Sequence, residues 1–452
     1  MTPPPDLVDK DVLIAALLSQ VERLTAQNAA LATRVAELEA KLGLPPKGPG
    51  NSSVPPSRGQ KPSGSSVANP KAKPHRGSHR ALHPNPTRTR DVFAAFCVCG
   101  ADVSGVAQDA LQTYDCIEIP KIEPDVTRVT LMGGLCPCCA RRFKAPPPRG
   151  LEPGSPFGPN VRALAIYLRS VQGIPLARLA EVLRDLLGLE ISEGALVNIL
   201  AAAGPAFTAQ VGRIKADLFA GTALASDETS CRVGKKNWWL WVFHHAASAV
   251  FVADRSRAKT VVEGFLGDWR PDYWISDRYG GQMGWAAKEH QVCLAHLIRD
   301  VQYAIDNGDE VLAPRVQQLL RDACAVGRRR DTLADATLKA YEARLDARLD
   351  RLMDLVPTTP AGRKLRTIFK KIRRHLFVFV THREVTATNN GSERAVRPCT
   401  IYRKVTNGFR SEWAAALYAD TRSVVETGRR RSVRALDAIR LTLAGTPLPM
   451  PP

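Results

Sequence analysis

Three acidic residues in separate parts of this sequence are the side chains best suited to do chemistry. Asp227 lies in "ALASDETS", Asp277 in "YWISDRYGG" and Glu393 in "TNNGSERAVRP". Between residues 361 and 410 there are thirteen Lys or Arg, and Glu393 is one of only two acids. Two divalent cations held by carboxylates could stabilise the attacking and leaving oxygens of phosphoryl transfer, while basic residues hold a nucleic-acid backbone. The hypothesis is therefore a magnesium or manganese site formed by Asp227, Asp277 and Glu393.

These acids also have simpler interpretations. The spacing from Asn390 to Glu393 is that of a capping box, so Glu393 could serve only to cap a helix. Asp227 and Asp277 could be turn residues at strand ends. Competing carboxylates that periodicity does not exclude are Glu228, Asp254 and Asp300.

The middle of the chain predicts strands that would bring the first two acids together. The pattern of "GTALASDETSCRV" predicts a strand ending near Asp227, and "NWWLWVFHH" with "SAVFVADRS" predicts a hairpin. A helix in "KTVVEGFLG" and a buried strand in "YWISDRYGG" follow. The chain should be helical from Asp300 to about Leu376, and Glu393 should open a short helix that Pro398 interrupts.

The N-terminal segment predicts a parallel dimeric coiled coil. One seam of the heptad repeat contains Leu17, Leu24, Leu31 and Leu38; the other contains Ile14, Val21, Asn28, Val35 and Leu42. Asn28 would fix the register, and Arg34 could pair with Glu39 of the other chain. The alternative is an amphipathic helix that packs on its own protein.

Residues 46–90 hold nine Lys or Arg and no acid, which is typical of a disordered basic linker, either a solvated tether or an arm along phosphates.

Six of the ten cysteines lie between residues 97 and 139, which favours a metal site over disulfides. Cys136 and Cys139 have the C-x-x-C spacing that holds zinc, whereas Cys97 and Cys99 are only two apart. We expect a zinc ribbon-like module with an uncertain fourth ligand, for which Cys116 or Cys138 could substitute. The alternative is a set of free thiols in a reducing compartment.

Residues 160–200 predict two helices joined by a turn at Gly188, with Ser192 capping the second. This outline is that of a helix-turn-helix, although many helical hairpins share it.

Charge and hydropathy limit the protein class. The 452-residue chain has a net charge of +19, which points to a polyanionic partner or an acidic membrane surface. No apolar run reaches the ~18 residues that span a bilayer, and acids near the N-terminus are unlike a signal peptide. We therefore expect a soluble cytoplasmic, nucleoid-associated protein of several domains.

Several stretches together resemble the transposases of the insertion sequence 66 family. They are "ALASDETSCRV", "NWWLWV", "SDRYGG", "CLAHLIRD", "TNNGSERAVRP" and "RKVTNGFRSEWAA". The resemblance implies a DDE transposase with a ribonuclease H-like mixed-sheet core, a helical insertion before the glutamate, and Asp227, Asp277 and Glu393 as the catalytic acids. Cys293 and His296 resemble the family's C-x-x-H element, which could bind metal, shape the site or be a buried structural pair. "FCVCG" departs from the C-x-x-C that the family usually has there.

The resemblance and the residue patterns together predict a multidomain α/β protein. The expected domains are a coiled coil (1–45), a basic linker (46–90), a zinc ribbon-like module (91–148), a helix-turn-helix-like domain (149–215), the first part of the core (216–308), a helical insertion (309–385), and the glutamate helix with a C-terminal tail (386–452).

The expected partners are DNA, both the terminal repeats of the protein's own element and target DNA, a second copy of the chain or a higher oligomer, and small accessory proteins. Candidate DNA contacts are Arg394, Arg397, Arg403, Lys404 and Arg410. The rival hypothesis is a non-catalytic DNA-binding regulator with a silent core.

Overall fold

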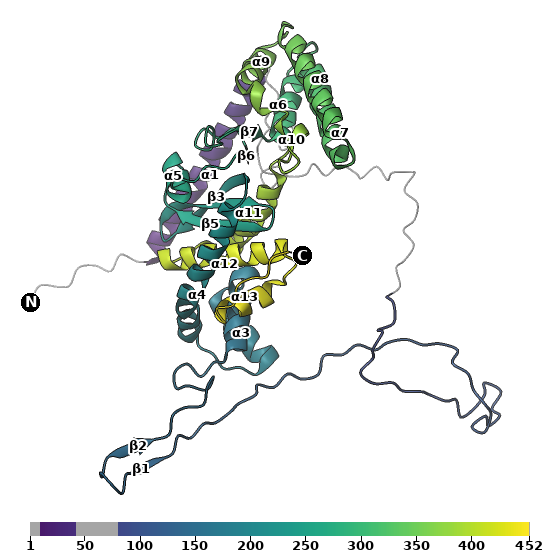
Figure 1. The fold of residues 1–452 in the computed structure, drawn as a ribbon, viewed down its shortest axis with the longest axis vertical. Helices are drawn as coiled ribbons and strands as arrows, with labels where there is room; N and C mark the ends of the chain where they lie inside the picture. Colours follow the sequence, from purple (N-terminus) through teal and green to yellow (C-terminus); the bar gives the residue numbers. More distant parts are fainter. Residues whose placement is uncertain (1–9, 42–79, 452) are drawn as a thin grey trace, which may run out of the picture.

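A computed structural model describes residues 10–41 and 80–451 of the chain (Figure 1). The helix α1 (Lys10–Lys41) and an exposed arm, residues 80–158, precede the packed body. The arm contains a hairpin formed by β1 (Gly133–Leu135) and β2 (Arg142–Lys144). This hairpin lies at the tip of the extended arm, away from the packed body (Figure 1). Most of the predicted linker, residues 46–79, lies outside the described residues, as does Leu42 of the heptad seam.

The body is built on a mixed five-stranded sheet. Its strands are β3 (Ala223–Val233), β4 (Lys236–His245), β5 (Ser248–Asp254), β6 (Tyr273–Ser276) and β7 (Glu289–Val292). Their order across the sheet is β5-β4-β3-β6-β7. β4 is antiparallel to β3 and β5, whereas β3, β6 and β7 are parallel. The predicted order of three strands, helix α5 (Lys259–Leu266) and a further strand is confirmed.

The alternation of side chains along β4 divides the core into two layers, because successive strand residues point to opposite faces. Trp241 and Phe243 are fully buried and pack in a cluster with residues of α2 (Pro159–Ile166), α4 (Glu193–Phe219), α5 and α13 (Ala435–Leu443). Leu240 and Val242 pack in another cluster with residues of α11 (Asn390–Thr406) and α12 (Glu412–Arg430). Both faces of the sheet are therefore covered by helices.

The segment between the sheet and α11 is helical, as expected for the insertion. It follows α6 (Leu294–Asp306) and contains α7 (Ala313–Arg329), α8 (Asp335–Met353), α9 (Pro360–Ile372) and α10 (Val378–Thr381). Apolar residues of these helices form one buried cluster with the β6 and β7 side of the sheet. The insertion lies at one end of the body, opposite α3 (Leu176–Leu187) and α13 (Figure 1).

The predicted helical hairpin is present as α3 and α4. Gly188 adopts a left-handed conformation at the end of α3, and the Ser192 hydroxyl accepts a hydrogen bond from the Ala195 amide at the start of α4. α4 is the one described helix that is long and apolar enough to cross a membrane. Here it packs against β5 and α12, so its apolar side chains contribute to the core instead.

Three sequence predictions about these elements were wrong. β3 does not end near Asp227 but continues to Val233, because β4 pairs with it up to the turn at Gly234. Helix begins at Leu294 rather than after Asp300, and the short strand β7 precedes it. Pro398 does not interrupt α11, which is 17 residues long and continues past it to Thr406. A proline inside a helix removes one backbone hydrogen bond, and here buried neighbours such as Cys399 and Tyr402 hold the helix together.

Candidate active site

Asp227 and Asp277 lie beside each other on a pair of parallel strands. In this pair Ala223 is opposite Tyr273 and Ala225 is opposite Ile275. Two residues further on, the same register places Asp227 next to Asp277, which directly follows β6. Neighbouring strands are about 4.8 Å apart. The prediction that these two aspartates belong to neighbouring strands is confirmed.

Both aspartates are oriented by backbone amides in an environment with excess negative charge. The Glu228 amide donates to Asp227 Oδ1 at 2.9 Å, and the Tyr279 amide donates to Asp277 Oδ1 at 2.8 Å. Burial, together with the negative charges of Glu228, Asp277 and Glu393, raises the pKa of Asp227 to about 8. At Asp227, burial and nearby negative charge therefore outweigh the backbone amide that stabilises the carboxylate.

Glu393 approaches the two aspartates from the first turn of α11. Its Oε1 atom lies 3.8 Å from Nε2 of His296 and 3.7 Å from a guanidinium nitrogen of Arg299, both on α6. α11 follows Asn389 and has no side-chain cap. The capping-box interpretation of Glu393 is therefore wrong, and its carboxylate is directed to α6 and the aspartates.

A buried polar network ties the start of α11 to the strand that carries Asp227. The side-chain amide of Asn389 donates to the carbonyl of Ser226 at 2.8 Å. The Ser392 hydroxyl donates to Asn389 Oδ1 at 2.6 Å, and Nε2 of His244 lies 2.8 Å from that hydroxyl. Sequence reasoning missed these roles. Asn389 and Ser392 lie within the quoted "TNNGSER", but nothing local to β4 marks His244.

The three competing carboxylates have other partners. Glu228 points to the opposite face of β3, where it binds Arg257 at 2.7 Å and the Gln282 amide at 2.6 Å. Asp254, at the end of β5, accepts a hydrogen bond from the Ser256 amide. Asp300, on α6, forms an ion pair with Arg278.

The donor set of the three acids suits magnesium or manganese, which prefer oxygen ligands. Within residues 10–41 and 80–451, however, no three His, Cys, Asp or Glu side chains are arranged closely enough to hold a metal ion. Each carboxylate instead faces a separate hydrogen-bond donor or cation. The fit to a divalent cation rests on the oxygen donors and on the uncompensated charge at Asp227.

The two residues of the C-x-x-H element have different surroundings. Cys293 is fully buried, its Sγ atom accepts a hydrogen bond from the Asn389 amide at 3.1 Å, and burial raises the pKa of its thiol. His296 faces Glu393, and burial lowers the pKa of its imidazole. Cys293 therefore supports the segment before α11, while His296 lies beside Glu393.

The candidate DNA contacts on α11 and after it are mostly accessible. Arg394, Arg397, Lys404 and Arg410 are exposed. Arg403 is half-buried, and its guanidinium donates to the carbonyl and, at 2.6 Å, to the hydroxyl of Ser230. Arg403 is thus bound to Ser230 of β3, and the other four residues are accessible to DNA phosphates.

A second basic surface lies on α9 and was not identified residue by residue from the sequence. Arg363, Lys370 and Lys371 are exposed and recur at helical spacing, so they share one face of α9, and Arg374 is exposed in the short 3-10 helix that follows. None of these four forms an ion pair with a described residue, whereas the adjacent Arg373 pairs with Asp350. The opposite face of α9, with Leu365, Phe369 and Ile372, is buried in the insertion.

The predicted zinc ligands form two separate turns. Hydrogen bonds from Cys99 lower the pKa of Cys97, and hydrogen bonds from Cys139 and Cys138 lower that of Cys136. The second turn closes the β1–β2 hairpin. Within the described chain the four thiols do not form one cluster. A zinc ribbon therefore stays a prediction, with its fourth ligand still open among Cys97, Cys116 and Cys138.

A comparison with protein families gives one match, described as the transposase family IS66, which spans residues 154–417. The matched segment runs from just before α2 into α12, so it includes the sheet, the insertion and all three acids. No curated protein matches the chain.

Proposed function

This chain belongs to the IS66 transposase family, and on that basis we propose that it cuts DNA at the ends of an insertion sequence and joins them to target DNA. The proposal is supported by Asp227 and Asp277, which come from neighbouring strands, and by Glu393, a helix residue whose charge contributes to the raised pKa of Asp227. The mixed sheet, with β4 as its antiparallel member, is compatible with the ribonuclease H-like core of DDE transposases.

The proposed reaction has two phosphoryl-transfer steps. In the first, water attacks the phosphorus at an element end, and the bond to the 3′ oxygen breaks to leave a 3′-hydroxyl and a 5′-phosphate. In the second, that 3′-hydroxyl attacks a target phosphodiester, and the displaced oxygen leaves as a new 3′-hydroxyl. Two magnesium or manganese ions, when bound, would stabilise the attacking and leaving oxygens.

The residues of this chain supply position and charge for that chemistry. Asp227 and Asp277 are fixed by the β3–β6 register and would provide ligand oxygens from the sheet. Glu393 would provide the third ligand, with His296 and Arg299 setting its orientation. The raised pKa of Asp227 means that its proton must leave before the carboxylate can act as a ligand. Cation binding and deprotonation of Asp227 should therefore be coupled.

DNA binding would depend mainly on contacts to phosphates. The exposed cations after Glu393 and those on α9 lie on different helices, so together they can follow a duplex over a long distance. The α3–α4 hairpin and the zinc ribbon-like module would add further contacts. Such contacts make affinity fall steeply with salt concentration.

We include in the proposal a homodimer formed through α1. Every side chain between residues 14 and 35 is exposed, including Ile14, Leu17, Val21 and Leu24, which are each more than 50% exposed. The alternative, in which this helix packs on its own protein, is therefore not the arrangement that the structure has. An uncovered seam with the a/d pattern fits a second copy of the helix. Two copies would hold two element ends together, in the cytoplasm and at the nucleoid, with or without accessory proteins.

The test is a cleavage assay on duplexes that carry the terminal repeats of the element. Asp227→Ala should abolish magnesium- or manganese-dependent cutting and leave metal-free duplex binding intact. Asp254→Asn is the matched control, since it removes a carboxylate from β5, which β4 separates from the strand that carries Asp227. A wild-type protein that binds the repeats but never cuts them would support the regulator instead. Full cutting by Asp227→Ala would refute the role of Asp227.

A further inference from the structure

The segment between α10 and α11 determines where Glu393 lies. α10 spans only Val378–Thr381, and α11 begins at Asn390. The last carbonyl groups of a helix have no partner within it, and buried carbonyls require a donor. For the segment 379–389, several of these donors come from outside the segment.

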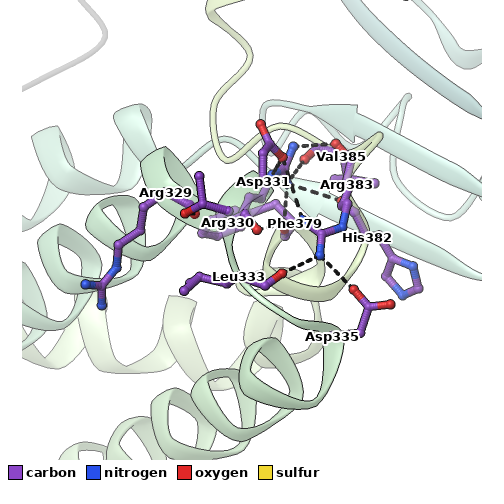
Figure 2. A network of polar contacts seen from close by, with 10 residues as sticks. Arg329, Arg330, Asp331, Leu333, Asp335, Phe379, His382, Arg383 and Val385 are labelled. Atoms are coloured by element: carbon purple, nitrogen blue, oxygen red, sulfur yellow. Dashed lines mark hydrogen bonds and ion pairs between the residues drawn. The ribbon is translucent and has the colours of Figure 1, made fainter.

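The main donor is a single arginine in the middle of the insertion. Arg330 lies between α7 and α8 and is buried. Its guanidinium donates to the carbonyl groups of Phe379, His382, Arg383 and Val385, as Figure 2 shows. Burial lowers the pKa of Arg330, and its nearest acid, Asp331, is a largely exposed neighbour at 3.7 Å. The Arg330 guanidinium therefore binds mainly backbone carbonyl groups.

Arg383 completes a reciprocal clasp. Its guanidinium donates to the carbonyl of Arg330 at 2.6 Å, to the carbonyl of Leu333 at 2.7 Å and to Asp335 Oδ1 at 2.7 Å (Figure 2). Each arginine therefore binds the backbone of the other's segment. The clasp joins the α7–α8 connection to the residues that leave α10.

The far end of the same segment is attached to the sheet and to α6. The backbone amide of Leu294 donates to the carbonyl of Ala387 at 3.0 Å, and the backbone amide of Asn389 donates to Cys293 Sγ. Asn389 also binds the carbonyl of Ser226, the residue before Asp227. The path from the clasp to Glu393 is thus held at both ends, with Val385 fully buried between them.

We propose that Arg330 is a positioning residue for Glu393: by binding four carbonyls of the segment that leads to α11, it makes the placement of Glu393 depend on the folded insertion. The inference rests on the proposed function of Glu393 as a metal ligand. Arg330 itself contacts neither the three acids of the site nor the candidate DNA-binding residues named above. The insertion is then more than a spacer, because its internal connection sets the geometry of an acid on another element.

Arginine is required for this role. Its planar guanidinium has five donors in a fixed arrangement, whereas a lysine ammonium is a compact point charge with three. Lysine at this position could not reach four carbonyls in the same arrangement, so Arg330→Lys should restore little. Residues that orient metal ligands typically change metal affinity by about 10- to 100-fold when they are lost. The expected loss for Arg330→Met is in that range.

The first measurement is hydrogen exchange in the full-length protein without metal. Arg330→Met should speed exchange in peptides that cover residues 386–396, which include the first turn of α11. Arg348→Met is the matched control, since Arg348 ties α8 to Asp322 of α7 at 2.6 Å and does not touch residues 379–389. It should speed exchange only within α7 and α8. Unchanged exchange at 386–396 in Arg330→Met would overturn the proposal, whatever the protein does to DNA.

The second measurement is manganese binding by calorimetry, with Glu393→Gln defining the signal that depends on Glu393. Arg330→Met should weaken this binding at least about tenfold, at a temperature where melting curves show the variant folded, and Arg348→Met should not. Guanidinium ion at low concentration should partly restore Arg330→Ala but not Arg348→Ala. Equal losses in the Arg330 and Arg348 variants would reduce Arg330 to a stabilising residue. Should Arg330→Met fail to fold, Arg383→Met removes the other half of the clasp and must show the same exchange pattern.

Discussion

Replacing Asp227 by asparagine should stabilise the metal-free protein, by an amount that depends on pH. The pKa of Asp227 is about 8 in the folded protein, against 3.8 as its ordinary value. Between these two values the unfolded chain has released the proton and the folded chain still holds it, so the stability of the wild type falls as pH rises. Asparagine keeps the Oδ1 acceptor for the Glu228 amide and carries no charge. As the pH rises, the free energy of unfolding of Asp227→Asn should therefore exceed that of the wild type by an increasing amount.

The slope of this difference follows from one proton, at about 1.4 kcal/mol per pH unit. Over the range from about pH 4 to about pH 8 it sums to an upper limit of about 6 kcal/mol, with no difference near pH 3. Urea unfolding at a series of pH values measures it, with chelator present and Asp254→Asn as control. Adding magnesium should then stabilise the wild type more than Asp227→Asn, because only the wild type gains a compensated carboxylate. A difference that does not change with pH, or equal stabilisation of both proteins by magnesium, would refute the argument that these acids form one uncompensated cluster.

Three further predictions concern other parts of the body. Replacing Lys370, Lys371 and Arg374 together by glutamine should lower the slope of log K against log salt for duplex DNA by about 0.9 per lost phosphate contact, so about 3 in total. The same change at Arg321, Arg344 and Arg351, exposed on α7 and α8, should leave the slope unchanged in a fluorescence anisotropy titration. Arg403→Met should lower the free energy of unfolding by about 1–3 kcal/mol, because Ser230 loses two hydrogen bonds, and it should not alter the salt slope. Burial, with the nearby His375, lowers the pKa of His290 to about 3, so the unfolded chain takes up a proton first as pH falls below 6.5. His290 alone should then lower wild-type stability by about 1.4 kcal/mol per pH unit as pH falls through that range, a contribution opposite in sign to that of Asp227, and acid titrations of His290→Gln should lack it.

The sequence predicted the elements whose signals are local. Alternation of apolar residues identified the hairpin of β4 and β5, and the spacing of Gly188 and Ser192 identified the ends of α3 and α4. The two aspartates followed from the same reasoning, because each lies close to the end of an apolar run. The position of β7 could not be found in this way, since "EHQV" has few apolar residues and is a strand only through its pairing with β6.

The rest of the site depends on contacts between distant parts of the chain. Arg403 is one cation in a basic tract by sequence, and only the packing of α11 against β3 shows that it binds Ser230. The same holds for Pro398, whose effect on α11 is set by buried neighbours and not by the local preference of proline. Arg330, in "GRRRDT", cannot be told from the arginines beside it without the structure. Its four carbonyl acceptors lie 49 to 55 positions further along the chain.

The three acids therefore differ in how firmly the fold places them. Asp227 and Asp277 belong to one sheet, and their relative position can change only if the β3–β6 register changes. Glu393 is reached only after the chain has passed through α7, α8, α9 and α10, and it is 38% exposed. Its position is defined by side chains from several elements: His296 and Arg299 on α6, Asn389 before α11, and Arg330 in the insertion. An interaction that shifts the insertion, such as phosphates on the basic face of α9, would thus act on Glu393 before the aspartates. Since a nuclease that is always assembled would damage its host, a third acid placed by the insertion offers a way to make cutting depend on correctly bound DNA.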